Sequence, residues 1–365
     1  MPKISPTTIA AFLLPFCVAS SVASAQETPA HEPPASSAAA PVQAPHHIVR
    51  RFPQDRDATV AIVGTRALSL GDLVDHIDAK HYPGFRKAME TRPEFQRMLQ
   101  SDLIAPWVRQ FADIEALRQT TKEKVDEEKL TAAQSAALKK MFQGWLDAYV
   151  NDARSKGRPD PSQRTVNVLL SDFQLRNGLA AEMQGWLDYL EPDDYSRGQL
   201  QKFFTEHARY FGGRVNIRHI LVQNRDAGTG ILLAEAGVAR AAARLADIKG
   251  RLLKDGSNFD ELARLYSDDT KTAQQGGELK GILRFDDRLP APLCRAAWLL
   301  EDGQVSDVVE TQYGWHLVKR VDFDQNLFIL FTDDAIPTIR DVMHRARQEE
   351  RLFAARHDTQ RQLMY

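Results

Sequence analysis

Cysteine, surplus charge and long apolar runs are all scarce in this 365-residue sequence. The 47 basic and 49 acidic side chains leave a formal net charge of −2, so no basic excess argues for nucleic-acid binding. No stretch reaches the ~20 consecutive apolar residues that a membrane-spanning helix needs. With 43% hydrophobic and 26% charged residues, the chain has the composition of a globular protein, and its length allows two or three domains.

The N-terminus has the features of a cleavable secretory signal. Lys3 precedes a short apolar stretch over residues 9–22, and Ala23-Ser24-Ala25 supplies the small residues of a cleavage site. Pro15 would interrupt a spanning helix, which favours cleavage over anchoring. We therefore expect residues 1–25 to be a signal peptide, the protein to be exported to the periplasm, and no membrane span to remain after cleavage.

Removal of that segment would leave Cys294 as the only cysteine, since the other, Cys17, lies inside it. A lone thiol cannot form an internal disulfide, so disulfide bonds are excluded despite the oxidising destination. Residues 26–55 follow as an Ala/Pro-rich segment whose first part has almost no large apolar residues. Such a composition predicts a flexible linker.

Residues 56–211 predict a mostly α-helical domain. It opens with a strand over Thr59–Val63, and Ser69 with Asp72 three residues on predicts a capping box that starts a helix. Apolar residues then recur at helical spacing in three further segments, 138–149, 179–190 and 200–211. We interpret these stripes first as the core of a helical bundle. A second interpretation is a groove for client chains, because Met and aromatic side chains repack around varied partners.

Proline marks the helix boundaries in this region. Pro93 can sit in the first turn of a helix, and Pro106 is expected to end or kink that helix. Pro159 and Pro161 separate two of the long helical segments.

The pattern changes after Gly212-Gly213, and residues 212–323 predict a compact α+β domain. Its elements are expected in the order β-α-α-β-α-β-β, which gives a small antiparallel sheet flanked by helices. A capping box of Ser257 and Asp260 is expected to start the second helix. The principal predicted elements are a strand at 215–222, helices at 238–252, 259–266 and 290–300, and a hairpin of 305–311 with 315–321.

The C-terminal residues 324–365 predict one more helix. Asp334 is expected to cap it, with Pro337 in its first turn. We expect this helix to pack back on the helical domain.

Four motifs occur in order within the α+β region. They are Arg218–Val222 (RHILV), Phe259–Asp269 (FDELARLYSDD), Gly276–Leu279 (GGEL) and Thr311–His316 (TQYGWH). Any one of them would be weak, but four at compatible spacings on the expected elements are specific. Over residues 214–322 the chain resembles the parvulin family of peptidyl-prolyl cis-trans isomerases.

The resemblance implies an isomerase that turns X-Pro bonds without a cofactor, a metal or a covalent intermediate. His219 and His316 match the paired central histidines of the family. Asp269 matches the position where relatives carry Asp or Cys, and Thr311 matches the hydroxyl linked to the histidines. The alternative is that both histidines are structural and that Asp269 is a solvated loop acid.

The resemblance also implies a substrate pocket. Leu279, Leu289 and Leu293 match residues that line the proline pocket, and Tyr313 is grouped with them as substrate-binding. Ordinary core packing is the rival role for Leu289 and Leu293. Leu293 stands where relatives usually have Phe, and Lys280 stands where Gly is usual.

Such a pocket suits the reaction. Resonance in the amide sets a barrier of ~18–20 kcal/mol to rotation. X-Pro bonds are the relevant substrates because their cis and trans forms lie within about 1 kcal/mol and interconvert slowly. An apolar pocket that holds the ring, with preorganised polar groups at the turning carbonyl, can favour the twisted state.

For the whole chain the resemblance implies an exported foldase whose partners are unfolded or newly exported polypeptides that contain proline. Two alternatives are a holdase-type chaperone and a dedicated maturation factor, either with a weakly active or inactive parvulin domain. Four other histidines receive no role: His76, His81, His207 and His344. The pair His46-His47 in the linker is interpreted as incidental rather than as a metal site.

Overall fold

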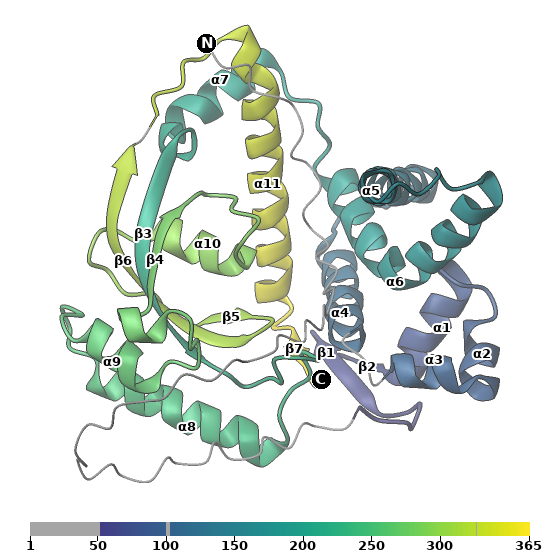
Figure 1. Ribbon diagram of the computed structural model, residues 1–365, viewed down its shortest axis with the longest axis horizontal. Helices are drawn as coiled ribbons and strands as arrows, with labels where there is room; N and C mark the ends of the chain where they lie inside the picture. The colour runs from purple at the N-terminus through teal and green to yellow at the C-terminus, as the bar shows by residue number, and fades with distance from the viewer. Residues whose placement is uncertain (1–51, 100–102, 326) are drawn as a thin grey trace.

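The structure is a computed structural model, and it describes residues 52–99, 103–325 and 327–365. The predicted signal peptide and almost all of the predicted linker lie outside the described residues. The described chain forms two lobes with a long C-terminal helix between them (Figure 1). Within the described residues, no helix has both the length and the apolar character needed to cross a membrane.

The first lobe is built from helices and a three-stranded sheet in the order β2-β1-β7. The strand β1 (Thr59–Val63) has the predicted bounds and pairs with β2 (Arg66–Ser69) and with the C-terminal strand β7 (Gln362–Leu363). Its helices are α1 (Leu70–Lys80), α2 (Phe85–Thr91), α3 (Pro93–Met98), α4 (Ile104–Thr120), α5 (Glu127–Ser155) and α6 (Gln163–Leu190). Their apolar faces share one core, in which Phe85 and Trp107 are among the largest buried side chains.

The predictions for Ser69 and for Pro106 had different outcomes. The capping box is confirmed, because Ser69 Oγ accepts the Asp72 N–H at 3.0 Å and the Ser69 N–H donates to the Asp72 carboxylate at 2.8 Å. The prediction for Pro106 was wrong, since the preceding helix α3 already ends at Met98. Pro106 lies instead in the first turn of α4, where its missing N–H needs no partner.

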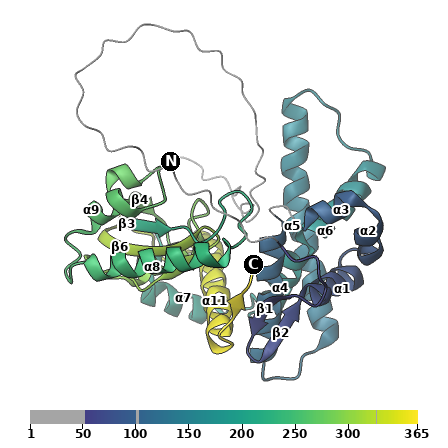
Figure 2. The same ribbon diagram turned by 90° about the horizontal axis from the view of Figure 1, so that it is seen from below.

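The longest helices, α5 and α6, pack against each other as a hairpin that extends away from the sheet of this lobe (Figure 2). Pro159 and Pro161 lie in the connection between them, as predicted. Ser162 caps α6 by accepting the Thr165 N–H at 3.3 Å.

The second lobe is an α+β unit around a four-stranded antiparallel sheet in the order β4-β3-β6-β5. The strands are β3 (Gly213–Val222), β4 (Glu278–Ile282), β5 (Val309–Thr311) and β6 (Gly314–Gln325). One face packs on α8 (Glu235–Arg251) and α9 (Phe259–Tyr266), and the other packs on α10 (Ala291–Leu299). The predicted fold class, an α+β domain with a small antiparallel sheet flanked by helices beside a mostly helical region, is confirmed.

Two predicted caps were wrong. The helix α9 begins at Phe259 after Asn258, whose side chain does not cap it but bonds backwards to Leu253 N and Arg251 O. The predicted box of Ser257 and Asp260 therefore does not form.

Asp334 likewise does not cap the C-terminal helix. It lies in a short 3-10 turn, η3 (Asp333–Ala335), that precedes α11 (Ile336–Asp358), and the N-cap residue Ala335 offers no side-chain acceptor. Pro337 is in the first turn of α11, as predicted.

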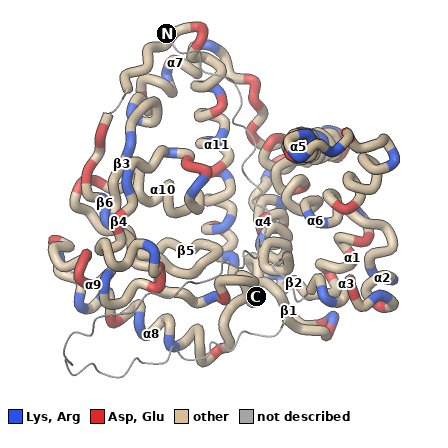
Figure 3. Tube along the Cα trace, viewed as in Figure 1, with Lys and Arg blue, Asp and Glu red and all other residues tan. Residues whose placement is uncertain are grey.

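The helix α11 contacts both lobes. Its N-terminal half buries Ile339 and Met343 against α7 (Arg197–Glu206) in a separate apolar cluster. Near its other end, Arg356 donates two hydrogen bonds to Asp113 of α4, at 2.9 and 2.6 Å. Toward α10, Glu350 pairs with Arg295 at 3.0 Å, where acidic and basic residues face each other (Figure 3).

Candidate active site

The sheet of the second lobe places the two predicted histidines on one face. Side chains alternate along a strand, so His219 of β3 shares its face with Val215 and Ile217, which pack toward α10. His316 on the neighbouring strand β6 shares the same face with Val318. The two imidazole rings lie nearly parallel, with centroids 5.5 Å apart and an interplanar angle of 17°.

Asp269 reaches His219 from the loop after α9. The loop is anchored on β3, because the Asp268 N–H donates to Leu221 O at 2.8 Å and the Asp268 carboxylate accepts the Gln223 N–H at 2.7 Å. This anchoring brings Asp269 Oδ2 to 2.9 Å from His219 Nε2. The Asp268 carboxylate thus binds the Gln223 amide and the Arg244 guanidinium, and Asp269 is the acid that contacts the histidine.

The β5–β6 turn places the Thr311 hydroxyl beside the second histidine, His316. Thr311 Oγ1 lies 2.9 Å from His316 Nε2 and accepts the Tyr313 N–H at 3.1 Å. Gly314 is required in this turn, because its φ is +142° and a Cβ there would lie 2.5 Å from Val222 O. The turn therefore fixes Thr311 against the histidine pair.

These contacts form one continuous chain of polar groups. His219 Nδ1 and His316 Nδ1 are 3.3 Å apart, which joins the Asp269 end to the Thr311 end. When both imidazoles are neutral, Thr311 Oγ1–H donates to His316 Nε2, and His316 Nδ1–H donates to His219 Nδ1. His219 Nε2–H then donates to the ionised Asp269 carboxylate, so every contact in the chain has one proton.

The electrostatics agree with this arrangement. Burial, and next the neighbouring His219, lower the pKa of His316 to about 3, so this imidazole is neutral at physiological pH. The hydrogen bond from His219 is the main cause that holds the pKa of Asp269 below its usual range. The Thr272 hydroxyl lowers that pKa further, whereas partial burial acts in the opposite direction.

Thr272 belongs to this group of side chains and was not predicted. Its Oγ1 donates to Asp269 Oδ2 at 2.7 Å and lies 3.0 Å from His219 Nε2. The sequence signal was available, because a Thr three residues after an Asp in a loop is well placed for a local side-chain hydrogen bond.

The residues predicted to bind substrate differ in exposure. Leu293 of α10 is only 2% exposed and belongs to the apolar core below the sheet. Leu279 of β4 and Leu289 are partly buried against that core, and Tyr313 at the β5–β6 turn is 37% exposed. Lys280, the unusual residue of β4, pairs with Glu278 at 3.0 Å.

Comparison with known proteins identifies this lobe. Residues 219–322 match the PPIC-type PPIase domain of the Rotamase family. Over 126 residues the chain is 32% identical to the peptidyl-prolyl cis-trans isomerase pin1 of Schizosaccharomyces pombe. This match covers 33% of this chain and 70% of pin1. The chain belongs to the parvulin-type rotamase family.

Two chaperone relatives match a shorter share of their own length. Chaperone SurA of Methylococcus capsulatus is 31% identical over 150 residues, which is 41% of this chain and 28% of SurA. Foldase protein PrsA of Bacillus subtilis is 31% identical over 110 residues, or 30% of this chain and 31% of PrsA. The matched segments thus span about a third or less of SurA and PrsA, so these matches describe only part of each protein.

Proposed function

We propose that this parvulin is a peptidyl-prolyl cis-trans isomerase that acts on X-Pro bonds of exported, unfolded polypeptides. The observation that carries the proposal is the continuous chain Asp269–His219–His316–Thr311 on a parvulin fold. The histidines and Thr311 are buried, whereas the Asp269 side chain is 23% exposed. Asp269 is therefore the member of the chain that can meet a substrate.

The proposed mechanism is electrostatic. In a planar amide, resonance places negative charge on the carbonyl oxygen, and a fixed carboxylate beside that oxygen disfavours the planar form. His219 and Thr272 hold the carboxylate ionised and in place, so it need not reorganise during the turn. No bond is formed to the protein, and apolar contacts from Leu279, Leu289 and Tyr313 would hold the proline ring.

The test is isomerisation of a proline-containing tetrapeptide by the purified chain. Asp269→Asn keeps the shape and removes the charge, and it should lower kcat/KM by about tenfold or more. His219→Ala should do the same. The matched control is Asp307→Asn on the exposed surface of the same lobe, which should leave kcat/KM unchanged. A folded wild-type chain that does not accelerate the reaction, or an Asp269→Asn variant as active as the control, would refute the assignment.

We further propose that the helical region holds clients, with residues 56–211 and 324–365 acting together as the chaperone domain. The supporting observation is a row of aromatic rings on α5, where Trp145 stacks on Phe142 and on Tyr149 with centroids 6.0 and 5.4 Å apart. Tyr149 is 40% exposed and Val168 on α6 is 64% exposed. Such a surface can contact apolar segments of an unfolded chain.

Suppression of aggregation of an unfolded protein measures this second activity. Tyr149→Ser with Val168→Ser should weaken suppression and leave tetrapeptide isomerisation intact, whereas Asp269→Asn should do the reverse. An Asp269→Asn variant that also fails to suppress aggregation would contradict a holding surface that is separate from the active site. The proposed export to the periplasm is tested by cell fractionation together with the N-terminal mass of the mature chain, which should lack residues 1–25.

A further inference from the structure

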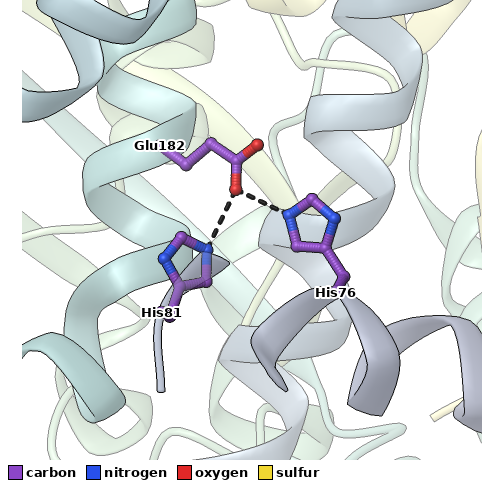
Figure 4. Close-up of side chains that lie close together, drawn as sticks. All are labelled: His76, His81 and Glu182. Carbon is purple, nitrogen blue, oxygen red and sulfur yellow. Dashed lines mark hydrogen bonds and ion pairs between the residues drawn. The ribbon is translucent and has the colours of Figure 1, made fainter. Parts of the chain in front are cut away.

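Two histidines and a glutamate converge in the first lobe (Figure 4), whereas the proposed active site lies in the second lobe. His76 lies on α1, His81 is the C-cap residue of the same helix, and Glu182 lies on α6. His76 Nε2 is 2.6 Å and His81 Nε2 is 2.9 Å from the same oxygen, Glu182 Oε2. Two imidazoles thus present the same ring nitrogen to one point beside one carboxylate oxygen.

The group is largely shielded from solvent. The Glu182 side chain is 2% exposed, that of His81 9% and that of His76 19%. The three side chains therefore form a largely enclosed polar group inside the first lobe.

Packing around the group holds both rings in position. A Cβ at Gly178, one turn before Glu182 on α6, would lie 2.6 Å from His81 Cγ, so the glycine lets this ring approach the helix. The His76 ring packs on Phe111 of α4, with centroids 5.1 Å apart. Lys80 Nζ lies 2.9 Å from Glu182 Oε1, which leaves Oε2 for the histidine side.

We propose that His76, His81 and Glu182 form a binding site for a divalent transition-metal ion of the zinc type. Two imidazole nitrogens and one carboxylate oxygen are the ligands that such ions favour, and three protein ligands leave a fourth position for water. The ion would bind His76 Nε2, His81 Nε2 and Glu182 Oε2, with the ring protons on Nδ1.

The three ligand atoms all lie within 4.8 Å of one another, so one ion can reach all of them after an adjustment of the side chains. Tetrahedral coordination with ligand distances of about 2.0–2.1 Å separates ligand atoms by roughly 3.3 Å. The two N···O distances are 2.6 and 2.9 Å, so the side chains need to separate by about half an ångström as the ion takes the place of the shared protons.

Space for the fourth ligand lies on the same side. A surface cavity of about 290 Å³ is lined by His76 and Glu182, so a bound ion would face water there. The other cations at the cavity have partners of their own, since Arg66 and Arg118 both bond to Glu115. Lys80 competes directly with a bound ion for the carboxylate, because it already pairs with Glu182.

The test uses the full chain, freed of metal with a chelator and then titrated with Zn²⁺ by calorimetry. We expect one ion per chain at this site. His81→Asn and Glu182→Gln should each weaken binding by at least about tenfold. Lys80→Ala should tighten it, because it removes a positive charge next to the carboxylate. Mg²⁺ and Ca²⁺, which prefer oxygen ligands, should not compete.

Controls separate this site from other histidines. His46→Ala with His47→Ala and, separately, His357→Ala should leave the Zn²⁺ affinity of the site unchanged. Co²⁺ in place of Zn²⁺ should give the visible absorption of a tetrahedral complex in the wild type and lose it in His81→Asn. Circular dichroism checks that each variant is folded, and Lys80→Ala changes a half-exposed residue that should not affect folding.

Three results would overturn the proposal. One is a folded wild-type chain that binds no Zn²⁺. A second is binding that is unchanged in a folded His81→Asn variant, and a third is an affinity that falls in Lys80→Ala. Any of them would leave the group as a hydrogen-bonded network that joins α1 to α6.

Discussion

The ion pair between Asp113 and Arg356 should contribute strongly to stability, because it joins α11 to α4 inside the molecule. Asp113 is 2% exposed and accepts two hydrogen bonds from Arg356, and Arg361 lies 3.3 Å away. Burial disfavours the ionised carboxyl, but the two guanidinium groups outweigh it and hold the pKa of Asp113 below its usual range. Asp113→Asn removes the charge and keeps the shape.

The magnitude follows from what the substitution leaves behind. Removal of one partner of a buried pair costs about 3–5 kcal/mol, because the remaining charge is buried without compensation. The Arg356 side chain is 32% exposed and can regain water, whereas Arg361 is only 11% exposed and cannot. Because Arg356, which donates both hydrogen bonds, can regain water, we expect the lower end of this range. The loss should be about 3 kcal/mol in the free energy of unfolding.

Urea unfolding followed by tryptophan fluorescence measures this loss. The matched control is Asp160→Asn, since Asp160 accepts hydrogen bonds from Arg154 at 2.8 and 2.5 Å on the surface, where both side chains are more than half exposed. The two hydrogen bonds from one arginine are alike in both pairs, but the Asp160 pair is exposed and has no second arginine, so the control should show no measurable change. An Asp113→Asn variant as stable as Asp160→Asn would refute the reasoning.

The same pair predicts a pH dependence. The folded-state pKa of Asp113 lies below its unfolded value of about 3.8, so its contribution is complete above that value and is lost as the pH falls through the folded pKa. The difference in stability between the wild type and Asp113→Asn should therefore be constant near neutral pH and shrink in strong acid. A difference that grows on acidification would contradict the assigned direction.

Three further predictions concern the second lobe. Gly277→Ala should destabilise it by at least about 2 kcal/mol in thermal or urea unfolding, because φ is +74° and a Cβ would lie 2.1 Å from His219 O; a neutral effect would contradict this. Burial raises the pKa of the Cys294 thiol to about 11, so peptide mapping should find it unlabelled by a thiol reagent until the chain unfolds. Thr272→Val should raise the pKa of Asp269 in an NMR titration, because it removes the hydroxyl bonded to Oδ2, and should lower kcat/KM; an unchanged pKa would exclude this role.

Features that depend on neighbouring residues were largely predictable from the sequence. The strand Thr59–Val63 and the capping box of Ser69 and Asp72 involve residues at most a few positions apart, so their signals are local. The order of elements in the α+β lobe was also predictable, because strand alternation and helical periodicity were strong there. His219, Asp269, His316 and Thr311 could be chosen because the family motifs identify them, and the structure brings all four together.

The two wrong predictions of helix caps have a common physical cause. A cap depends on the conformation of one residue, and several side chains compete for the same few N–H groups. Asp255 takes the Ser257 N–H at 3.0 Å, and the Asn258 side chain turns back to residues 251 and 253, so the box with Asp260 cannot form. The expected role of Asp334 fails in a similar way, because a 3-10 turn shifts the start of α11 beyond it.

Contacts between distant helices could not be predicted from local patterns. His81 and Glu182 are 101 positions apart, and Asp113 and Arg356 are 243 apart. Each of these residues is an ordinary polar residue in its own helix, and only the packing of α1 on α6 and of α11 on α4 makes it part of a buried group. Gly178 is a sequence signal near the contact between His81 and Glu182. A glycine inside a helix is unfavourable unless something packs closely against it. A helical glycine one turn from a buried acid therefore indicates where a distant side chain approaches, although it does not identify that side chain.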